Sequence, residues 1–341
     1  PVMWSLLTVS LATSTIITMS SHHWLLAWLG LELNTMSILP IIMKSYHPRA
    51  VEATTKYFLI QAPAAALILF ASTLNAWQTG QWTITQTTAP MTTIITIALL
   101  MKLGLAPTHA WYPEVLQGST LNTAMIISTW QKLAPLALLY LMNNNLPTNL
   151  ILTLGLTSAL VGGWTGLNQT QTRKIMAYSS IAHMGWLSTM LTLNLNITTL
   201  ALTTYIIMTT TMFMMLSTTT TKTLTNMGMN WSQSPPLTTM MMITLMSLGG
   251  LPPLMGFAPK WMILDTLCQM KLLLFSTILA LASLPSLFFY VRMAYFTTLT
   301  APPATTNTQQ KWRFKIQPPL GLMTTATSSA LLLPLLPLMM T

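Results

Sequence analysis

The sequence predicts an all-α protein that crosses a membrane many times. Only 5% of its 341 residues are charged and 52% are hydrophobic, whereas a soluble domain has about 25% charged residues. Apolar stretches recur at the length, about 20 residues, that a helix needs to span the hydrocarbon layer. Glycine and proline gather at a few points inside and between these stretches. We therefore expect a polytopic bundle of about eleven transmembrane helices.

The apolar stretches and their breaks predict the position of each helix. The expected helices lie near residues 2–19, 23–43, 55–75, 90–111, 119–142, 149–167, 174–192, 196–219, 237–269, 272–297 and 320–340. The first five form one predicted half, residues 1–142, and the next five a second half, residues 143–297. A polar loop and the last helix make up residues 298–341.

Charge and cysteine content exclude several functions. The net charge of +10 comes from 14 Lys and Arg residues that are spread singly along the chain. Because they form no basic stripe, we expect no nucleic-acid binding. A single cysteine, Cys268, cannot form an internal disulfide, a thiolate metal cage or an iron–sulfur cluster held by this chain alone.

Two glycine- and proline-containing runs interrupt predicted helices. The first, MKLGLAPTHAWYPEV, begins at Met101 and breaks the fourth helix around residues 102–110; the second, LGGLPPLMGFAPKW, breaks the ninth around 248–260. Broken helices at corresponding places in two halves are typical of inverted-repeat transporters, whose ion sites lie at the breaks. Since each half has an odd number of helices, the second half should be inverted. A simple proline kink with a snorkelling lysine is the alternative for the first run.

Ionisable side chains at membrane depth are the candidate functional residues. Glu32 lies near the centre of an apolar span, Lys102 at the first break, Lys132 in the middle of the fifth helix and Lys260 just after the second break. A buried lysine can hold or release a proton, since burial favours the amine and a nearby carboxylate favours the ammonium ion. For Glu32, a structural ion pair is the alternative. Glu52, beside Arg49 and Lys56 in a basic loop, is expected to form a local ion pair.

Further polar side chains are candidates for a proton relay. His109 and Glu114 follow the first break, and the run RKIMAYSSIAHMGW, residues 173–186, carries Ser179, Ser180 and His183. The histidines titrate near physiological pH, and the serines could hold water. A hydrogen-bonded core histidine and plain helix packing through small hydroxyl residues are equally compatible with the sequence.

Five of the runs together resemble one family. They are HHWLLAWLGLELNTMSILP, HPRAVEATTKYFLIQA, MKLGLAPTHAWYPEVLQG, RKIMAYSSIAHMGW and GGLPPLMGFAPKW. The chain is similar over nearly its whole length to the NADH dehydrogenase subunit 2 family, the mitochondrially encoded antiporter-like membrane subunits of respiratory complex I. The resemblance implies that Glu32 is the acidic partner of Lys102, that Lys132 is the central lysine and that Lys260 is the terminal one.

The resemblance also implies the activity, cofactors and partners. The expected function is proton translocation in the mitochondrial inner membrane, coupled to quinone reduction elsewhere in the complex. NADH, FMN, iron–sulfur clusters and ubiquinone belong to the parent complex, and this chain is expected to bind no cofactor. The expected partners are neighbouring antiporter-like and small membrane-arm subunits, together with phospholipids such as cardiolipin. A stand-alone cation/proton antiporter and a purely structural membrane scaffold are the alternatives.

The loop charges predict the orientation in the membrane. Nine basic residues fall in loops on the N-terminal side of the predicted bundle: Lys44, Arg49, Lys56, Arg173, Lys174, Lys222, Lys311, Arg313 and Lys315. Loops on the opposite side have none. By the positive-inside tendency, the N-terminus should face the matrix and the C-terminus the intermembrane space.

Lysine-specific reagents test this orientation. We expect Lys311 and Lys315, in the long polar loop, to be labelled from the matrix side of intact inner-membrane vesicles, because both lie on the predicted basic face. Mass spectrometry of the labelled chain measures the result: inside-out vesicles expose the matrix face to a membrane-impermeant reagent, and right-side-out vesicles provide the control. Labelling of these lysines only from the opposite side would contradict the topology.

Overall fold

The chain folds as an all-helical protein in the computed structural model, which describes residues 2–44, 46–298 and 319–335. The predicted loop with Lys311, Arg313 and Lys315, and the end of the predicted last helix, lie outside the described residues. Helices occur within every predicted range of the described part. They are α1 (Val2–Ser20), α2 (Trp24–Met43), α3 (Pro48–Thr79), α4 (Ala89–Leu103), α5 (Trp111–Gly118), α6 (Leu121–Thr129), α7 (Leu133–Leu141), α8 (Thr148–Leu167), α9 (Thr172–Leu191), α10 (Leu195–Thr219), α11 (Leu224–Gln233), α12 (Pro235–Gly249), α13 (Phe257–Gln269), α14 (Leu273–Thr298) and α15 (Leu322–Leu331).

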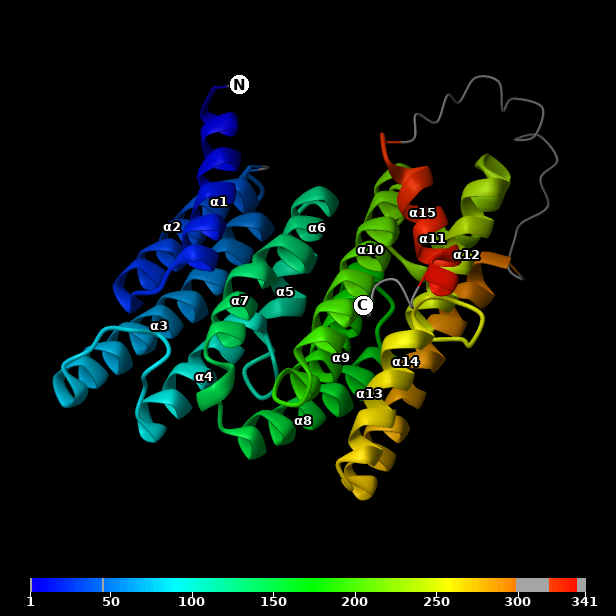
Figure 1. The fold of residues 1–341 in the computed structure, drawn as a ribbon. Coiled ribbons are helices and arrows are strands. Elements are labelled where there is room, and N and C mark those ends of the chain that lie inside the picture. Colours follow the sequence, from blue (N-terminus) through cyan, green and yellow to red (C-terminus); the bar gives the residue numbers. More distant parts are fainter. Residues whose placement is uncertain (1, 45, 299–318, 336–341) are drawn as a thin grey trace. The chain divides into compact units, whose positions relative to one another are not determined.

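The helices divide into two compact units. One comprises Pro1–Ser158 and Leu191–Leu195, and the other Ala159–Met190 and Asn196–Thr341. Within the first unit, α2 packs against α1 and α3, and α3 also contacts α4 and α5, as Figure 1 shows. Within the second, α14 contacts α11, α12 and α13. The half boundaries at residues 142 and 297 stay a prediction.

Seven described helical segments are long and apolar enough to cross a membrane. They are α1, α2, α3, the segment Leu121–Leu141, α8, α10 and α14. The segment Leu121–Leu141 combines α6, a 3₁₀ turn over Trp130–Lys132 and α7. Several described helices are rich in Ser and Thr, whose hydroxyls donate to backbone carbonyls one turn back; Thr96 to Thr93 at 2.9 Å and Thr211 to Met208 at 2.7 Å are examples. Hydroxyls bonded in this way can remain in an apolar layer without a further partner.

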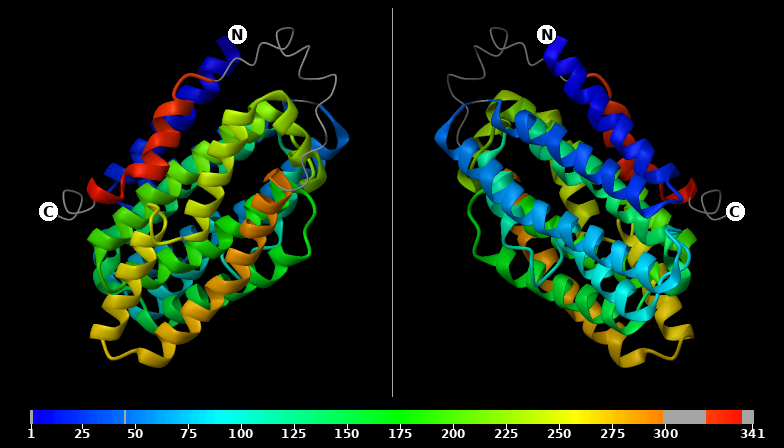
Figure 2. Two further views of the ribbon diagram at one scale, coloured as in Figure 1. Left: turned by 90° about the vertical axis from the view of Figure 1, so that its right-hand side faces the viewer. Right: turned by 90° about the vertical axis from the view of Figure 1, so that its left-hand side faces the viewer.

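Both predicted helix breaks are present. Gly104 ends α4 and Gly250 ends α12, each in the left-handed conformation with φ of 76° and 85°. This conformation suits glycine because it has no Cβ, and it stops the helix while its N–H bonds back into the last turn. The chain then continues as α5 and α13, and Figure 2 allows α12, its loop and α13 to be followed as parts of one interrupted helix.

Three local predictions were wrong. The segment with Glu52 was expected to be a loop, but α3 already begins at Pro48, because His47 Nδ1 accepts from the backbone N–H of Arg49 at 3.2 Å and proline suits the first helical turn. Helix α11 was missed, since it is short and polar. Lys132 was expected inside a regular helix and instead ends the 3₁₀ turn.

The second break depends on a close backbone approach at Gly256. A Cβ added there would lie 1.7 Å from the carbonyl oxygen of Ser247. We expect Gly256→Ala to destabilise the unit by about 1–3 kcal/mol or more, because backbone must move to admit the methyl group. Thermal inactivation of the assembled protein measures the effect.

Gly249→Ala is the matched control on the same break. Its Cβ would meet only Tyr290 side-chain atoms at 3.8 and 3.9 Å, an ordinary contact distance. Equal loss of stability in both variants would contradict the close approach at Gly256.

Candidate functional site

A small cavity in the first unit brings two of the predicted lysines together. Its volume is about 20 Å³, and its lining includes Lys102, Lys132, Gln61 and Gln131. The other lining residues are Leu31, Asn34, Thr35, Tyr57, Leu103, Trp111, Tyr112, Ile127 and Pro135. A polar cavity of this size has room for one or two water molecules with several hydrogen-bond partners. A water bridge between the two lysines therefore fits the site.

Lys102 is buried beside the first break. It occupies the last turn of α4, is 7% exposed, and its Nζ makes no hydrogen bond to a described residue. Its carbonyl, freed by the end of the helix, accepts from Gln61 Nε2 at 3.4 Å. A buried ammonium group without fixed acceptors needs water or a nearby negative charge. The break therefore places a lysine where its charge depends on the contents of the cavity.

Glu32 supplies a negative charge near this cavity without forming an ion pair with Lys102. No nitrogen–oxygen pair within 4 Å joins these two side chains, although Glu32 acts electrostatically on Lys102. The hydroxyl of Thr35, which lines the cavity, donates to the backbone carbonyl of the half-buried Glu32 at 2.8 Å and lies 3.1 Å from its carboxylate oxygen Oε2. The carboxylate thus reaches the cavity wall through one hydroxyl group.

Lys132 also lines the cavity. It is 3% exposed, and its Nζ is 5.1 Å from the centre of the Tyr112 ring. The adjacent Gln131 donates from Nε2 to Asn34 Oδ1 at 2.9 Å, which ties the 3₁₀ turn to α2. The 3₁₀ turn, held against α2, and the ring of Tyr112 together restrict the position of the Lys132 ammonium group.

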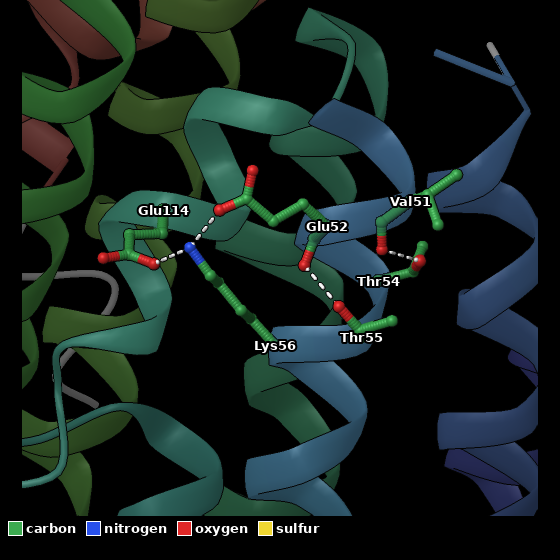
Figure 3. Close-up of polar contacts among 6 residues, drawn as sticks. All are labelled: Val51, Glu52, Thr54, Thr55, Lys56 and Glu114. Carbon is green, nitrogen blue, oxygen red and sulfur yellow. Dashed lines mark hydrogen bonds and ion pairs between the residues drawn. The ribbon is translucent and has the colours of Figure 1, made fainter. Parts of the chain in front are cut away.

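Helix α5, which carries Tyr112, is held against α3 at two levels. Near the cavity, Trp111 packs edge-on against Tyr57 with ring centres 5.6 Å apart. Farther along, Lys56 forms ion pairs with Glu52 and with Glu114, the latter at 2.6 Å (Figure 3). The local ion pair expected for Glu52 is confirmed, with Lys56 as its partner, and Lys56 also binds Glu114. These three side chains are substantially exposed.

His109 does not line the cavity. It lies on the segment between α4 and α5, where its Nδ1 is 3.2 Å from the carbonyl oxygen of Pro107. Neither His109 nor Glu114 forms a hydrogen bond or ion pair with the Lys102 side chain in the described part of the chain. The relay role expected for His109 stays a prediction.

The second unit has its own cavity of about 20 Å³, lined by Lys260 and His183 among others. Lys260 Nζ donates to the carbonyl of Gly249 at 2.8 Å, so the second break itself binds the lysine. His183 Nε2 is 3.3 Å from the Tyr290 hydroxyl, and its ring centre is 5.7 Å from that of Tyr205. A lysine and a histidine therefore line one small, mostly apolar cavity.

The two serines of the same sequence run have local partners. The hydroxyls of Ser179 and Ser180 donate to the carbonyls of Met176 and Ala177, both at 2.7 Å. Both are buried, and Ser179 also interacts with the side chain of Tyr290, whose hydroxyl lies 3.3 Å from His183. Water binding and helix packing both stay open for these serines.

The sequence did not identify several residues that shape the two sites. Tyr112, Gln61 and Tyr290 carry no charge, and only their place beside a break or a buried lysine marks them. Arg292 on α14 was not identified either: its guanidinium donates to the carbonyls of Leu167 and Gln169 at 2.5 and 2.6 Å. In the described part of the chain, no three His, Cys, Asp or Glu residues form a metal-binding group.

Comparison with protein-family models and solved structures defines the class. Residues 21–285 match the transmembrane model "NADH:quinone oxidoreductase/Mrp antiporter", and residues 287–340 match "NADH dehydrogenase subunit 2 C-terminus". A chain of respiratory complex I from Thermus thermophilus has a TM-score of 0.86 and 25% identity, over 100% of this chain and 78% of that one. A chain of the Mrp complex from Dietzia has a TM-score of 0.83 at 13% identity, over 98% and 75%. The fold is that of an antiporter-like membrane subunit.

Curated relatives give the family. The proteins named NADH-ubiquinone oxidoreductase chain 2 from Carassius auratus and Xenopus laevis are 52% and 50% identical, each over 100% of this chain and 99% of the relative. That from Polypterus ornatipinnis is 50% identical over 99% of this chain and 98% of the relative. The chain belongs to the NADH-ubiquinone oxidoreductase chain 2 family.

The contacts of Arg292 predict a structural role. Arg292→Lys keeps the positive charge but not the planar fork that reaches two carbonyls, so we expect it to destabilise the assembled protein by about 1–3 kcal/mol. Proton pumping per assembled complex should stay normal. Native gels and pumping assays measure the two quantities, and full assembly with reduced pumping would contradict this assignment.

Proposed function

We propose that this chain is the antiporter-like, proton-translocating membrane subunit of a mitochondrial NADH:ubiquinone oxidoreductase, complex I. It is a multi-pass membrane protein of the inner membrane. Its family membership and fold support this function, and the cavity shared by Lys102 and Lys132 is the observation that carries the mechanism. The full-length similarity to chain 2 proteins favours this function over a stand-alone antiporter or a scaffold.

In the proposed mechanism, a proton passes between Lys102 and Lys132 through water in their cavity. The Glu32 carboxylate favours the ammonium form of the nearby lysine, whereas loss of hydration favours the amine. A change in the hydration of the cavity or in the position of Glu32 therefore moves the proton. The Thr35 hydroxyl, bonded to Glu32 and facing the cavity, couples the carboxylate to this water.

Lys260 is the proposed terminal group of the path. Its ammonium is held by the carbonyl of Gly249, which favours the charged form, and His183 in the same cavity is the proposed exchange partner. A neutral imidazole can accept a proton at one nitrogen and pass one on from the other. His109, half-buried beside the first break, is a proposed entry group.

The redox chemistry is assigned to other subunits. We propose that NADH, FMN, iron–sulfur clusters and ubiquinone are bound elsewhere in the complex, and that neighbouring membrane-arm subunits and phospholipids such as cardiolipin cover the apolar outer surface. The distribution of basic loop residues supports a matrix-facing N-terminus and a C-terminus in the intermembrane space.

Substitution of Lys102 tests the mechanism. We expect Lys102→Ala to lower proton pumping at least about tenfold, because a titrating group of the path is lost. Lys102→Arg should have a similar effect, since arginine can still attract Glu32 but stays protonated. Pumping and coupled ubiquinone reduction are measured in the assembled complex reconstituted in liposomes.

Lys271→Ala is the control, because Lys271 is an exposed lysine in the turn between α13 and α14 and should be nearly silent. Normal pumping by a fully assembled Lys102→Arg variant would make Lys102 a static counter-charge and refute the proposed transfer.

A further inference from the structure

The charged end of Lys132 lies over the face of an aromatic ring, which is the arrangement of a cation–π interaction. The Lys132 Nζ lies over the Tyr112 ring, 5.1 Å from its centre. An ammonium ion within about 6 Å of an aromatic face is attracted by the negative potential of that face, whereas a neutral amine is not. Both side chains are almost fully buried, at 3% and 2% exposure. Burial strengthens the attraction because little water screens it.

The position of this ring is fixed from several sides. Tyr112 packs edge-on against Trp111, with ring centres 5.4 Å apart. Its own Cβ lies 3.5 Å from the place where a Cβ of Gly104 would be, so the tyrosine lies directly against the first helix break. Trp111 in turn contacts Tyr57 on α3. The ring is therefore a fixed surface rather than a side chain that adapts to Lys132.

Tyr112 lines the same cavity as both lysines. Gly104 follows Lys102 by two residues, and Tyr112, Lys102 and Lys132 all line one cavity. The other titratable group that lines the cavity is Tyr57, from α3. Glu32 on α2 is connected to the cavity through the hydroxyl of Thr35. No acidic side chain is among the lining residues.

We propose that Tyr112 is a positioning residue for the central lysine, and that its ring face holds the Lys132 ammonium at the wall of the shared cavity and thereby favours the protonated form of Lys132. This role rests on the proposed function. It assigns the stabilisation to the aromatic face and not to the tyrosine hydroxyl. In proton transfer, the ring makes Lys132 a better acceptor of the proton released by Lys102.

Replacement of the ring tests the proposal in the complete complex reconstituted in liposomes. In Tyr112→Leu the ammonium form loses its aromatic partner, so a lower pH is needed to protonate Lys132. We expect the alkaline limb of the pumping-versus-pH profile to move down by about 0.5–1 pH unit. Tyr112→Phe keeps the ring face and should retain the wild-type profile.

Tyr295→Leu is the control, since Tyr295 is an exposed residue of α14 outside the cavity lining and loss of its ring should leave the profile in place. An unshifted profile for Tyr112→Leu, or an equal shift for Tyr112→Phe, would overturn the proposal. If Tyr112→Leu does not assemble, Tyr112→Met replaces it as a ring-free variant of closer volume. Failure of both to assemble, with normal Tyr112→Phe, would also overturn it by showing that the ring acts through packing.

Pumping by Lys132→Ala separates a failure of the proposed function from a failure of the role of Tyr112. Normal pumping by Lys132→Ala would refute a titrating role of that lysine and hence the proposed path. Impaired pumping by Lys132→Ala combined with a wild-type profile for Tyr112→Leu would refute the role of Tyr112 alone.

Discussion

The cost of holding an ammonium group in an apolar layer governs the structure around Lys102, Lys132 and Lys260. A buried charge must find a compensating charge, dipole or water. The three lysines find different ones: Lys102 lies in a polar cavity within reach of the field of Glu32, Lys132 lies over an aromatic ring, and Lys260 binds a carbonyl. None of these partners is a carboxylate within 4 Å in the described part of the chain. Each ammonium group is therefore stabilised by a partner that does not hold it permanently in the protonated form.

The helix breaks supply these weaker partners. An unbroken helix bonds its carbonyls internally, whereas an ended helix leaves its last carbonyls free. At the second break the carbonyl of Gly249 binds Lys260, and at the first the carbonyl of Lys102 accepts from Gln61. Gly104 and Gly250 make both endings possible by adopting the left-handed conformation. The breaks thus determine where a lysine can remain buried and still exchange a proton.

The sequence predicted the helical class, the two breaks and the buried lysines, because long apolar runs, glycine–proline clusters and isolated charges are local signals. It did not predict contacts between distant segments. The pairing of Lys56 with Glu114, the ring of Tyr112 beneath Lys132 and the hydrogen bond from Gln131 to Asn34 all join residues on different helices. It also missed the 3₁₀ turn at Trp130–Lys132, since three residues give no periodic pattern.

Arginine and lysine have different tasks in this chain for a chemical reason. Arg292 reaches two carbonyls at the end of α8, and its guanidinium can stay there permanently because it does not deprotonate in proteins. An ammonium group makes fewer fixed bonds and can release its proton when its surroundings change. At the two cavities the chain has lysine. A permanently charged group in either cavity would require a permanent counter-charge, and that pair would stop the proton at the point where it has to move on.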